Sequence, residues 1–378
     1  MKKLLFVINV DTFFLSHRLP LALEAIKRGY EVYLLTADTG KRDEIEGYGV
    51  HLIDIPFERS GTNLFHEIKC IKLLISQYKG LKPDIVHHVT LKAALLGSIA
   101  AKLSNTKNVI NAISGLGYNF TSGRNGPLQK LILIMMKRSF KSKNFYFILQ
   151  NPDDIEMMKN SKYVPDSHHK LIKGSGVDLN EFPFSEFIVK DKLTILFPAR
   201  ILYDKGILEL VNAAILLKDK WKNRIVFILA GECDESNKSV VFQADLEKLL
   251  IPEYIEWIGF RKDMLEQYIN SDIVVLPSYR EGLPKSLIEA CAIGRPIITT
   301  DVPGCRECVT DGYNGYLVPV KTTEPLSSAI EKLCESKEKR FEMGKNSRTL
   351  AEKDFSIQSV LDKTFSIYDE ILEKKLTQ

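Results

Sequence analysis

Short apolar runs rich in β-branched residues alternate with longer helical patterns from one end of this chain to the other. Such alternation predicts βαβ units, in which parallel strands are covered on both faces by helices. We therefore expect a doubly wound α/β fold. The runs that we interpret as strands cover residues 4–10, 31–36, 51–55, 84–89, 108–112 and 145–149, and then 193–197, 225–230, 255–258, 273–276 and 297–300.

The strands fall into two sets, separated by residues 174–192, which lack clear periodicity and supply turn formers. The chain has 378 residues, so each set is long enough to bury a core of its own. We expect two Rossmann-like domains, residues 1–178 and 179–355. Residues 356–378 carry apolar side chains at helical spacing, which predicts a terminal helix.

The composition excludes several classes of protein. The net charge of +4, from 52 basic and 48 acidic residues, is too small to indicate wholesale nucleic-acid binding. No run of 18 apolar residues occurs, so no membrane-spanning helix is expected. The first apolar run is short, contains Asn9 and precedes no small-residue cleavage site, which favours a buried strand over a signal peptide.

The six cysteines give little sign of a metal site or of disulfides. Only Cys305 and Cys308 form a C-x-x-C pair, and one such pair without a second is a weak zinc signal. Because nothing indicates secretion, we expect reduced thiols in the cytoplasm.

The most informative stretch covers residues 272–319. An apolar strand ends at Pro277, and a helical pattern runs from near Pro284 to Gly294. The loop between them lies where open parallel sheets bind ligands, and a helix start offers N–H groups to an anion. The turn is made by Gly282, Leu283, Pro284 and Lys285, with Glu281 before it and Glu289 one turn into the helix. A phosphate at the amides and hydroxyl groups at the carboxylates would fit a nucleotide sugar.

The segment EGLPKSLIE at 281–289 resembles the Glu, seven residues, Glu signature of the retaining GT-B glycosyltransferases of family 4. The segments PIITTDVPGCRE and DGYNGYLVP, which follow it, also resemble that family. The resemblance implies two Rossmann-like domains facing across a cleft, with the final helix crossing back onto the first. It also implies that Glu281 contacts the transferred sugar and Glu289 the ribose.

Two further segments of the second domain resemble donor-binding parts of the family. In ARILYDKG, the Arg200 guanidinium can donate two parallel hydrogen bonds and the Lys205 ammonium is a compact positive charge. Both kinds of group bind diphosphates. The family places an Arg and a Lys here for the donor diphosphate. WIGFRKDM at 257–264 resembles the turn that contacts the base, which implies that Phe260 and Arg261 lie near the uracil.

The first strand of the chain is not followed by a G-x-G-x-x-G triplet, which argues against a dehydrogenase. The segment FFLSHRLP instead resembles the branch of family 4 that assembles bacterial surface polysaccharides. We expect His17, Arg18 and Lys92 to contact the acceptor. Phe13 and Phe14 belong to the same segment, but they could instead have a purely structural role and pack on the next helix.

His87 and His88 stand at the carboxyl end of a predicted strand, the position of ligand contacts in such sheets. Family 4 often has His-x-His near this point, but here Val89 falls where the second histidine would be. Either histidine could face the substrate, and a purely structural role is the alternative.

Residues 128–143 combine an apolar face with several lysines and Arg138. A basic amphipathic helix can lie in a membrane interface, but it can equally pack on the core with a solvated basic side. Both interpretations stay open. In NPDDIEMMKN at 151–160, an Asn cap followed by first-turn acids explains the paired aspartates without a metal.

The resemblance predicts a retaining, metal-independent hexosyltransferase that needs no cofactor. It would move a hexose or N-acetylhexosamine from a UDP-sugar to a sugar on a polyprenyl-diphosphate-linked acceptor, in O-antigen, capsule or glycan assembly. Glu281, His87 and His88 are the candidate catalytic residues. We expect a peripheral enzyme at the cytoplasmic face of the inner membrane. The alternatives are a GT-B UDP-sugar epimerase and a non-catalytic nucleotide-sugar-binding subunit.

Overall fold

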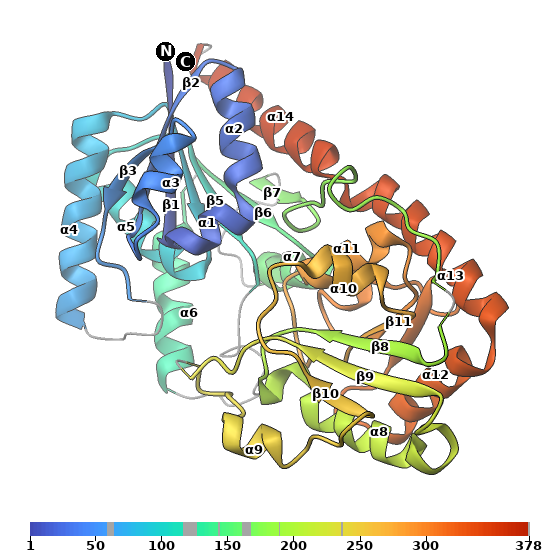
Figure 1. Cartoon of the computed structure of the whole chain (residues 1–378). Coiled ribbons are helices and arrows are strands. Elements are labelled where there is room, and N and C mark those ends of the chain that lie inside the picture. Colours follow the sequence, from blue (N-terminus) through green and yellow to red (C-terminus); the bar gives the residue numbers. More distant parts are fainter. Residues whose placement is uncertain are drawn as a thin grey trace. The chain divides into compact units, whose positions relative to one another are not determined.

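The computed structural model describes residues 1–58, 64–115, 127–142, 144–160, 168–188, 190–235 and 237–376, with the side chains of 127–132 and 374–376 left out. The chain divides into two compact units (Figure 1). The first comprises Met1–Ser175 and Ser359–Gln378, and the second comprises Gly176–Gln358.

The first unit is built on a parallel sheet of seven strands in the order β3-β2-β1-β4-β5-β6-β7. Its central strands are buried along their whole length, as expected when helices cover both faces. The strands are β1 (Lys2–Val10), β2 (Tyr30–Ala37), β3 (His51–Asp54), β4 (Ile85–Val89), β5 (Val109–Ile113), β6 (Phe145–Leu149) and β7 (His169–Leu171).

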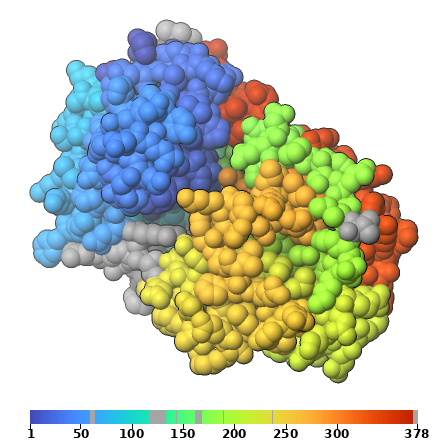
Figure 2. Space-filling view, viewed as in Figure 1, coloured from blue at the N-terminus to red at the C-terminus, as the bar shows by residue number. Residues whose placement is uncertain are grey.

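Helices connect these strands and cover the sheet. They are α1 (Asp11–His17), α2 (Leu19–Lys27), α3 (Arg42–Gly47), α4 (Leu64–Leu81), α5 (Leu91–Ser104), α6 (Pro127–Phe140) and α7 (Pro152–Asn160). Helix α4 presents Lys69 and Lys72 to solvent, and its light-blue segment lies at the surface of this unit in Figure 2. As predicted, Asn151 caps α7: the Asp154 N–H donates to Asn151 Oδ1 at 2.8 Å.

The second unit repeats the same plan with a parallel sheet of six strands in the order β10-β9-β8-β11-β12-β13. The strands are β8 (Leu193–Pro198), β9 (Ile225–Ala230), β10 (Ile255–Trp257), β11 (Ile273–Leu276), β12 (Ile297–Thr300) and β13 (Gly315–Val318). The helical segments are η3 (Tyr203–Lys205), α8 (Ile207–Trp221), α9 (Gln243–Glu247), α10 (Met264–Ile269), α11 (Lys285–Ile293), η4 (Arg306–Cys308), α12 (Glu324–Glu335), α13 (Lys337–Leu350) and η5 (Ala351–Phe355).

The final helix, α14 (Ile357–Leu376), returns to the first unit. There the buried Tyr368 hydroxyl forms a hydrogen bond with His87 Nδ1, and Phe365 packs on Tyr30 with ring centroids 6.3 Å apart. Adjacent strand residues point to opposite faces of a sheet. Because His87 contacts α14 and His88 contacts Tyr78 of α4, these two helices cover opposite faces of β4.

All eleven predicted strands are present, and the doubly wound α/β prediction is confirmed for both units. One edge strand of each sheet, β7 and β13, was not predicted from the sequence. In each sheet the strand order reverses once, between β1 and β4 and between β8 and β11. Such switch points are where open α/β sheets bind ligands, at the carboxyl ends of the strands.

Candidate active site

The loops that follow β8 and β11 bring Lys205 and Glu281 together at the switch point of the second unit. Lys205 follows β8, and Glu281 follows β11. The Lys205 ammonium forms an ion pair with Glu281 Oε1, and Ser278 Oγ donates to the same oxygen at 2.7 Å. Both charged side chains are mostly buried, so this pair is shielded from solvent.

Glycines allow these loops to approach each other closely. Gly206 has φ +76°, and a Cβ there would lie 2.1 Å from the Pro277 carbonyl oxygen. A Cβ on Gly304, at φ +83°, would lie 2.4 Å from the Glu281 carbonyl oxygen. Only glycine avoids both the left-handed backbone penalty and these clashes. The loop that carries Glu281 is therefore in close contact with two other segments, one at Gly206 after β8 and one at Gly304 after β12.

Helix α11 begins directly after this loop, as predicted. Pro284 is its N-cap, in extended conformation, and Gly294 ends it at φ 83°. The turn of Gly282, Leu283 and Pro284 precedes Lys285 at the first helical position. The positive end of the helix dipole is therefore directed to the same region as Lys205.

Glu289 lies one turn inside α11 and is only 8% exposed. Its Oε2 accepts a hydrogen bond from the Tyr268 hydroxyl at 3.1 Å, and Lys285 Nζ lies 3.5 Å from Oε1. Burial raises the pKa of Glu289, and the charge of Lys285 opposes that shift. This is a carboxylate held by specific partners, not a solvated surface charge.

Arg200 stands after β8 and pairs with Asp234, with Nη1 to Oδ2 at 2.5 Å. Nearby, burial raises the pKa of the Asp204 carboxyl, which accepts a hydrogen bond from the Ser239 hydroxyl. Phe260 and Arg261 follow the edge strand β10. Phe260 is 64% exposed, and Arg261 pairs with Asp263 within its own turn, with Nη2 to Oδ2 at 2.5 Å.

In the first unit the structure separates the roles of the two histidines. Both ring nitrogens of His88 are engaged, Nε2 with the Tyr78 hydroxyl at 2.8 Å and Nδ1 with Asn111 Oδ1 at 2.7 Å. His87 Nδ1 meets the Tyr368 hydroxyl at 2.7 Å, whereas its Nε2 is buried without a hydrogen-bond partner among the described residues. This arrangement favours His87 as the histidine available to a ligand.

The predicted acceptor residues lie near the switch point of the first unit, in different surroundings. His17 stacks on Phe13, with ring centroids 4.1 Å apart, and Phe14 is buried against Phe6. Arg18 is buried at 6% exposure. Lys92 forms an ion pair with Glu67 at 2.6 Å and donates to the Glu58 carbonyl oxygen at 2.7 Å.

Several residues that complete these arrangements were not identified from the sequence. They are Ser278, Tyr268, Asp234 and Gly304. Of these, only Ser278 could have been identified from the sequence, because it lies in the same loop as Glu281. The others come from distant loops and helices, and their proximity depends on the sheet order.

Comparison with known protein families identifies the chain. Residues 178–350 match the family model described as glycosyl transferases group 1, and residues 3–151 match the one described as glycosyl transferase 4-like. The chain belongs to these glycosyltransferases. The family predicted from the EGLPKSLIE and ARILYDKG segments is thus confirmed.

Curated relatives of this glycosyltransferase share about a quarter of its residues. An N,N'-diacetylbacillosaminyl-diphospho-undecaprenol alpha-1,3-N-acetylgalactosaminyltransferase from Campylobacter jejuni is 28% identical and covers 95% of this chain and 98% of its own. A UDP-Gal:alpha-D-GlcNAc-diphosphoundecaprenol alpha-1,3-galactosyltransferase from Escherichia coli is 26% identical, covering 92% of this chain and 90% of its own.

Solved structures confirm the GT-B fold. Anabaena HepE, crystallised with UDP and glucose, superposes with a TM-score of 0.79 at 15% identity and covers 98% of this chain and 100% of its own. The sucrose-phosphate synthase of Thermosynechococcus elongatus gives a TM-score of 0.81 at 18% identity. The match covers 99% of this chain and 100% of the synthase chain. At these identities the likeness concerns the fold.

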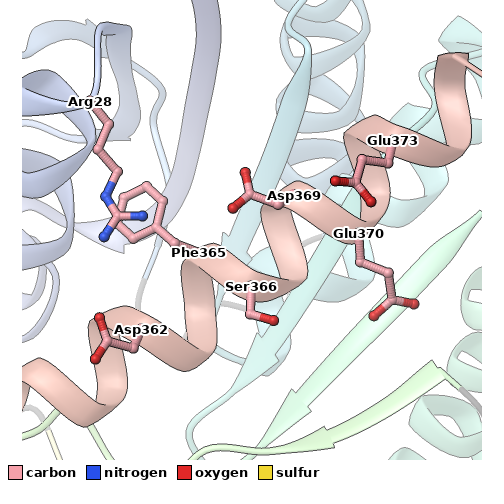
Figure 3. A pocket seen from close by; sticks show the side chains of 7 residues that line it. All are labelled: Arg28, Asp362, Phe365, Ser366, Asp369, Glu370 and Glu373. Carbon is pink, nitrogen blue, oxygen red and sulfur yellow. The ribbon is translucent and has the colours of Figure 1, made fainter.

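A groove lies on α14 of the glycosyltransferase (Figure 3). It is lined by Arg28, Asp362, Phe365, Ser366, Asp369, Glu370 and Glu373. The Arg28 guanidinium lies 4.0 Å from the centre of the Phe365 ring, and the other charged residues are acidic. Because a diphosphate would be repelled by four carboxylates, this groove is not the donor site.

The described residues show neither a metal-ligand cluster nor a membrane-spanning helix. Among them, no group of three or more His, Cys, Asp or Glu side chains is placed to hold a metal ion. In the same part of the chain, no helix is both long and apolar enough to cross a bilayer. The basic helix predicted within residues 128–143 corresponds to α6. Five of its predicted residues lie outside the described side chains, namely Leu128, Lys130, Leu131, Ile132 and Lys143.

Proposed function

We propose that this glycosyltransferase moves a hexose or N-acetylhexosamine from a UDP-sugar to a sugar hydroxyl on a polyprenyl-diphosphate-linked acceptor. The observation that carries the proposal is the Lys205–Glu281 pair at the switch point of the second unit. A cation and a carboxylate side by side match the two charges that develop when an anomeric carbon leaves a phosphate. The names of the Campylobacter and Escherichia relatives support this acceptor class.

Lys205, Arg200 and the start of α11 are proposed to bind the donor diphosphate. When the bond from the anomeric carbon to oxygen breaks, UDP takes the electron pair and its β-phosphate gains negative charge. Cationic groups already in place stabilise that charge more in the transition state than in the ground state. The protein's own charges would thus supply the stabilisation without a metal or other cofactor.

Glu281 is proposed to orient the transferred sugar and offset the positive charge on its ring. Its Oε1 is engaged by Lys205 and Ser278, which hold the carboxylate in one position. The acceptor oxygen forms the new bond on the face that UDP leaves, and its proton passes to a β-phosphate oxygen. Stereochemistry at the anomeric carbon is thereby retained.

Glu289 is proposed to accept hydrogen bonds from the ribose hydroxyls, and Phe260 with Arg261 to lie near the uracil. The exposed ring of Phe260 suits stacking on a base. In the first unit, His17, Arg18, His87 and Lys92 are proposed to face the acceptor. Because such an acceptor is membrane-bound, the enzyme would work at the cytoplasmic face of the inner membrane, in O-antigen, capsule or glycan assembly.

The deciding experiment measures UDP release from a panel of UDP-sugars, with and without a synthetic lipid-diphosphate sugar. Release that requires the acceptor, together with a product one sugar larger, supports the transferase. A UDP-sugar converted to another UDP-sugar without acceptor would instead identify the epimerase. UDP binding without turnover on any acceptor would identify a binding subunit.

A further inference from the structure

Arg18 is a buried cation with no carboxylate partner among the residues that the structure describes. Its side chain is 6% exposed, and its Nη1 donates to the His17 carbonyl oxygen at 2.9 Å. Its Nε is buried with no hydrogen-bond partner, and no ion pair joins it to a carboxylate among the described residues. Burial lowers the pKa of Arg18 only to about 10, so the guanidinium stays charged at neutral pH. An isolated buried charge is costly unless something pairs with it.

His87 supplies a second unsatisfied nitrogen beside this cation. Its Nε2 is buried and has no hydrogen-bond partner within the described ranges, and His87 is 1% exposed. Burial, followed by the positive charge of Arg18, lowers the pKa of His87 well below its ordinary value. The imidazole is therefore neutral, and what Nε2 can do depends on which nitrogen carries the proton.

Tyr368 is the hydrogen-bond partner of His87 Nδ1. Burial raises the pKa of the Tyr368 phenol, so it keeps its hydrogen. Among the described residues, the only hydrogen-bond partner of its hydroxyl is His87 Nδ1, at 2.7 Å. If the hydroxyl donates to Nδ1, the imidazole hydrogen lies on Nε2, and His87 is a hydrogen-bond donor there. The proposal below requires this direction, and the tautomer experiment tests it.

Two buried nitrogens, one of them cationic, thus lie without a hydrogen-bond partner in the described part of the chain, near the β1–β4 switch point of the first unit, where ligands bind in such sheets. We propose that Arg18 and His87 form an oxyanion site that binds a phosphoryl oxygen of a substrate, with Tyr368 as the positioning residue that sets the His87 tautomer. This inference rests on the proposed function in one respect, namely that the phosphoryl group belongs to the acceptor or donor of the transfer reaction.

A binding experiment tests the site without any turnover. Inorganic pyrophosphate is titrated calorimetrically into the full chain carrying Arg200→Ala and Lys205→Ala, which disables the second-unit site. We expect residual binding that Arg18→Met weakens at least tenfold. Arg28→Met, at the other end of α2, is the matched control and should leave it unchanged. No residual binding, or binding indifferent to Arg18→Met, would overturn the proposal.

A tautomer experiment separates a donor from a base at His87. The amide of His87→Gln retains an N–H donor, whereas His87→Leu does not. If the site binds an oxyanion, His87→Gln keeps pyrophosphate affinity within a few fold of the parent while His87→Leu loses it. Tyr368→Phe should weaken binding to an intermediate extent, because it releases the His87 tautomer. Equal loss in the Gln and Leu variants would contradict the assignment of a donor.

Kinetics then identify which substrate supplies the phosphoryl group. Two acceptors with the same sugar are compared, one an alkyl diphosphate and one a simple alkyl glycoside. If Arg18→Met raises KM only for the alkyl diphosphate, the acceptor supplies the phosphoryl group. If Arg18→Met instead weakens UDP binding, the donor supplies it. Equal losses on both acceptors with unchanged UDP affinity would overturn the site. If the parent enzyme transfers to neither acceptor, the proposed function fails while the pyrophosphate titration still decides the oxyanion site.

Stability distinguishes a binding role from a structural one. Removing an uncompensated buried charge in favour of an apolar side chain of similar length is commonly neutral or stabilising. We expect the Tm of Arg18→Met to equal or exceed that of the parent. A lower Tm together with equal losses on both acceptors would assign Arg18 to the core instead.

Discussion

Tyr268 of α10 donates its hydroxyl hydrogen to Glu289 Oε2 of α11 across 3.1 Å, and both side chains are buried. The same hydroxyl lies 3.0 Å from the Ser286 carbonyl oxygen. The Tyr268 carbonyl oxygen in turn accepts from the fully buried Arg295 at 3.0 Å. The proposed ribose contact is therefore held by a chain of buried groups.

Tyr268→Phe should weaken donor binding. A hydrogen bond to a charged group contributes roughly 1.5–3 kcal/mol, so we expect UDP affinity to fall about tenfold or more. The control is Tyr254→Phe, which removes a buried hydroxyl bonded to the Ala214 carbonyl oxygen at 2.7 Å, remote from Glu289 in sequence and contacts. Calorimetric UDP titration of both variants makes the comparison. Equal affinities would exclude Tyr268 from donor binding.

Glu289→Gln should change how stability depends on pH. Because burial raises the pKa of Glu289 above its ordinary value of 4.5, the folded state holds this proton to higher pH than the unfolded state. The contribution of this group to stability therefore falls as pH rises from about 4 through the raised pKa, and is constant above it. Urea unfolding from pH 4 to 7 should show Glu289→Gln gaining stability relative to the parent over that window. The same substitution at the exposed Glu256 is the control, and identical profiles would refute the prediction.

Glu281→Gln should abolish most turnover while the protein remains folded. The substitution keeps the shape of the side chain but removes the negative charge beside Lys205, which is proposed to offset the charge on the sugar ring. We expect kcat to fall at least a hundredfold, roughly 2.7 kcal/mol of transition-state stabilisation. Glu256→Gln should leave kcat unchanged. Normal turnover in Glu281→Gln would remove this carboxylate from the mechanism.

The sequence was sufficient to predict the fold, because the alternation of apolar runs and helical patterns is decided locally. It also predicted Lys205 and Glu281 as partners in one site, through family resemblance, although 76 residues separate them. Their ion pair forms because β8 and β11 are neighbours in the sheet. No local sequence pattern predicts which strands are neighbours. The edge strands β7 and β13 were missed because neither is a plain apolar run: β7 reads His-Lys-Leu, and β13 begins at a glycine.

The first unit shows a second limit of sequence reasoning. His87 and His88 are indistinguishable in the sequence, yet adjacent strand residues face opposite sides of the sheet, where different helices supply their partners. Asn111 and Tyr78 engage His88, whereas Tyr368, which engages His87, is 281 residues away in sequence. Side-chain burial at Arg18 is likewise a property of the assembled unit, since an arginine in a loop is ordinarily exposed.

Gly304→Ala should damage catalysis more than stability, because the added methyl group would press on the backbone that carries Glu281. The Cβ would lie 2.4 Å from the Glu281 carbonyl oxygen and 2.5 Å from that of Gly282, so this loop must shift. Gly312→Ala is the matched control, since Gly312 also has positive φ, +74°, but nothing lies within 4 Å of its Cβ. Both variants incur the left-handed backbone cost of roughly 1–2 kcal/mol. Only Gly304→Ala should lower kcat, by about tenfold or more, as measured by acceptor-dependent UDP release beside thermal unfolding. If both variants lose activity equally, the position of Glu281 does not depend on this contact.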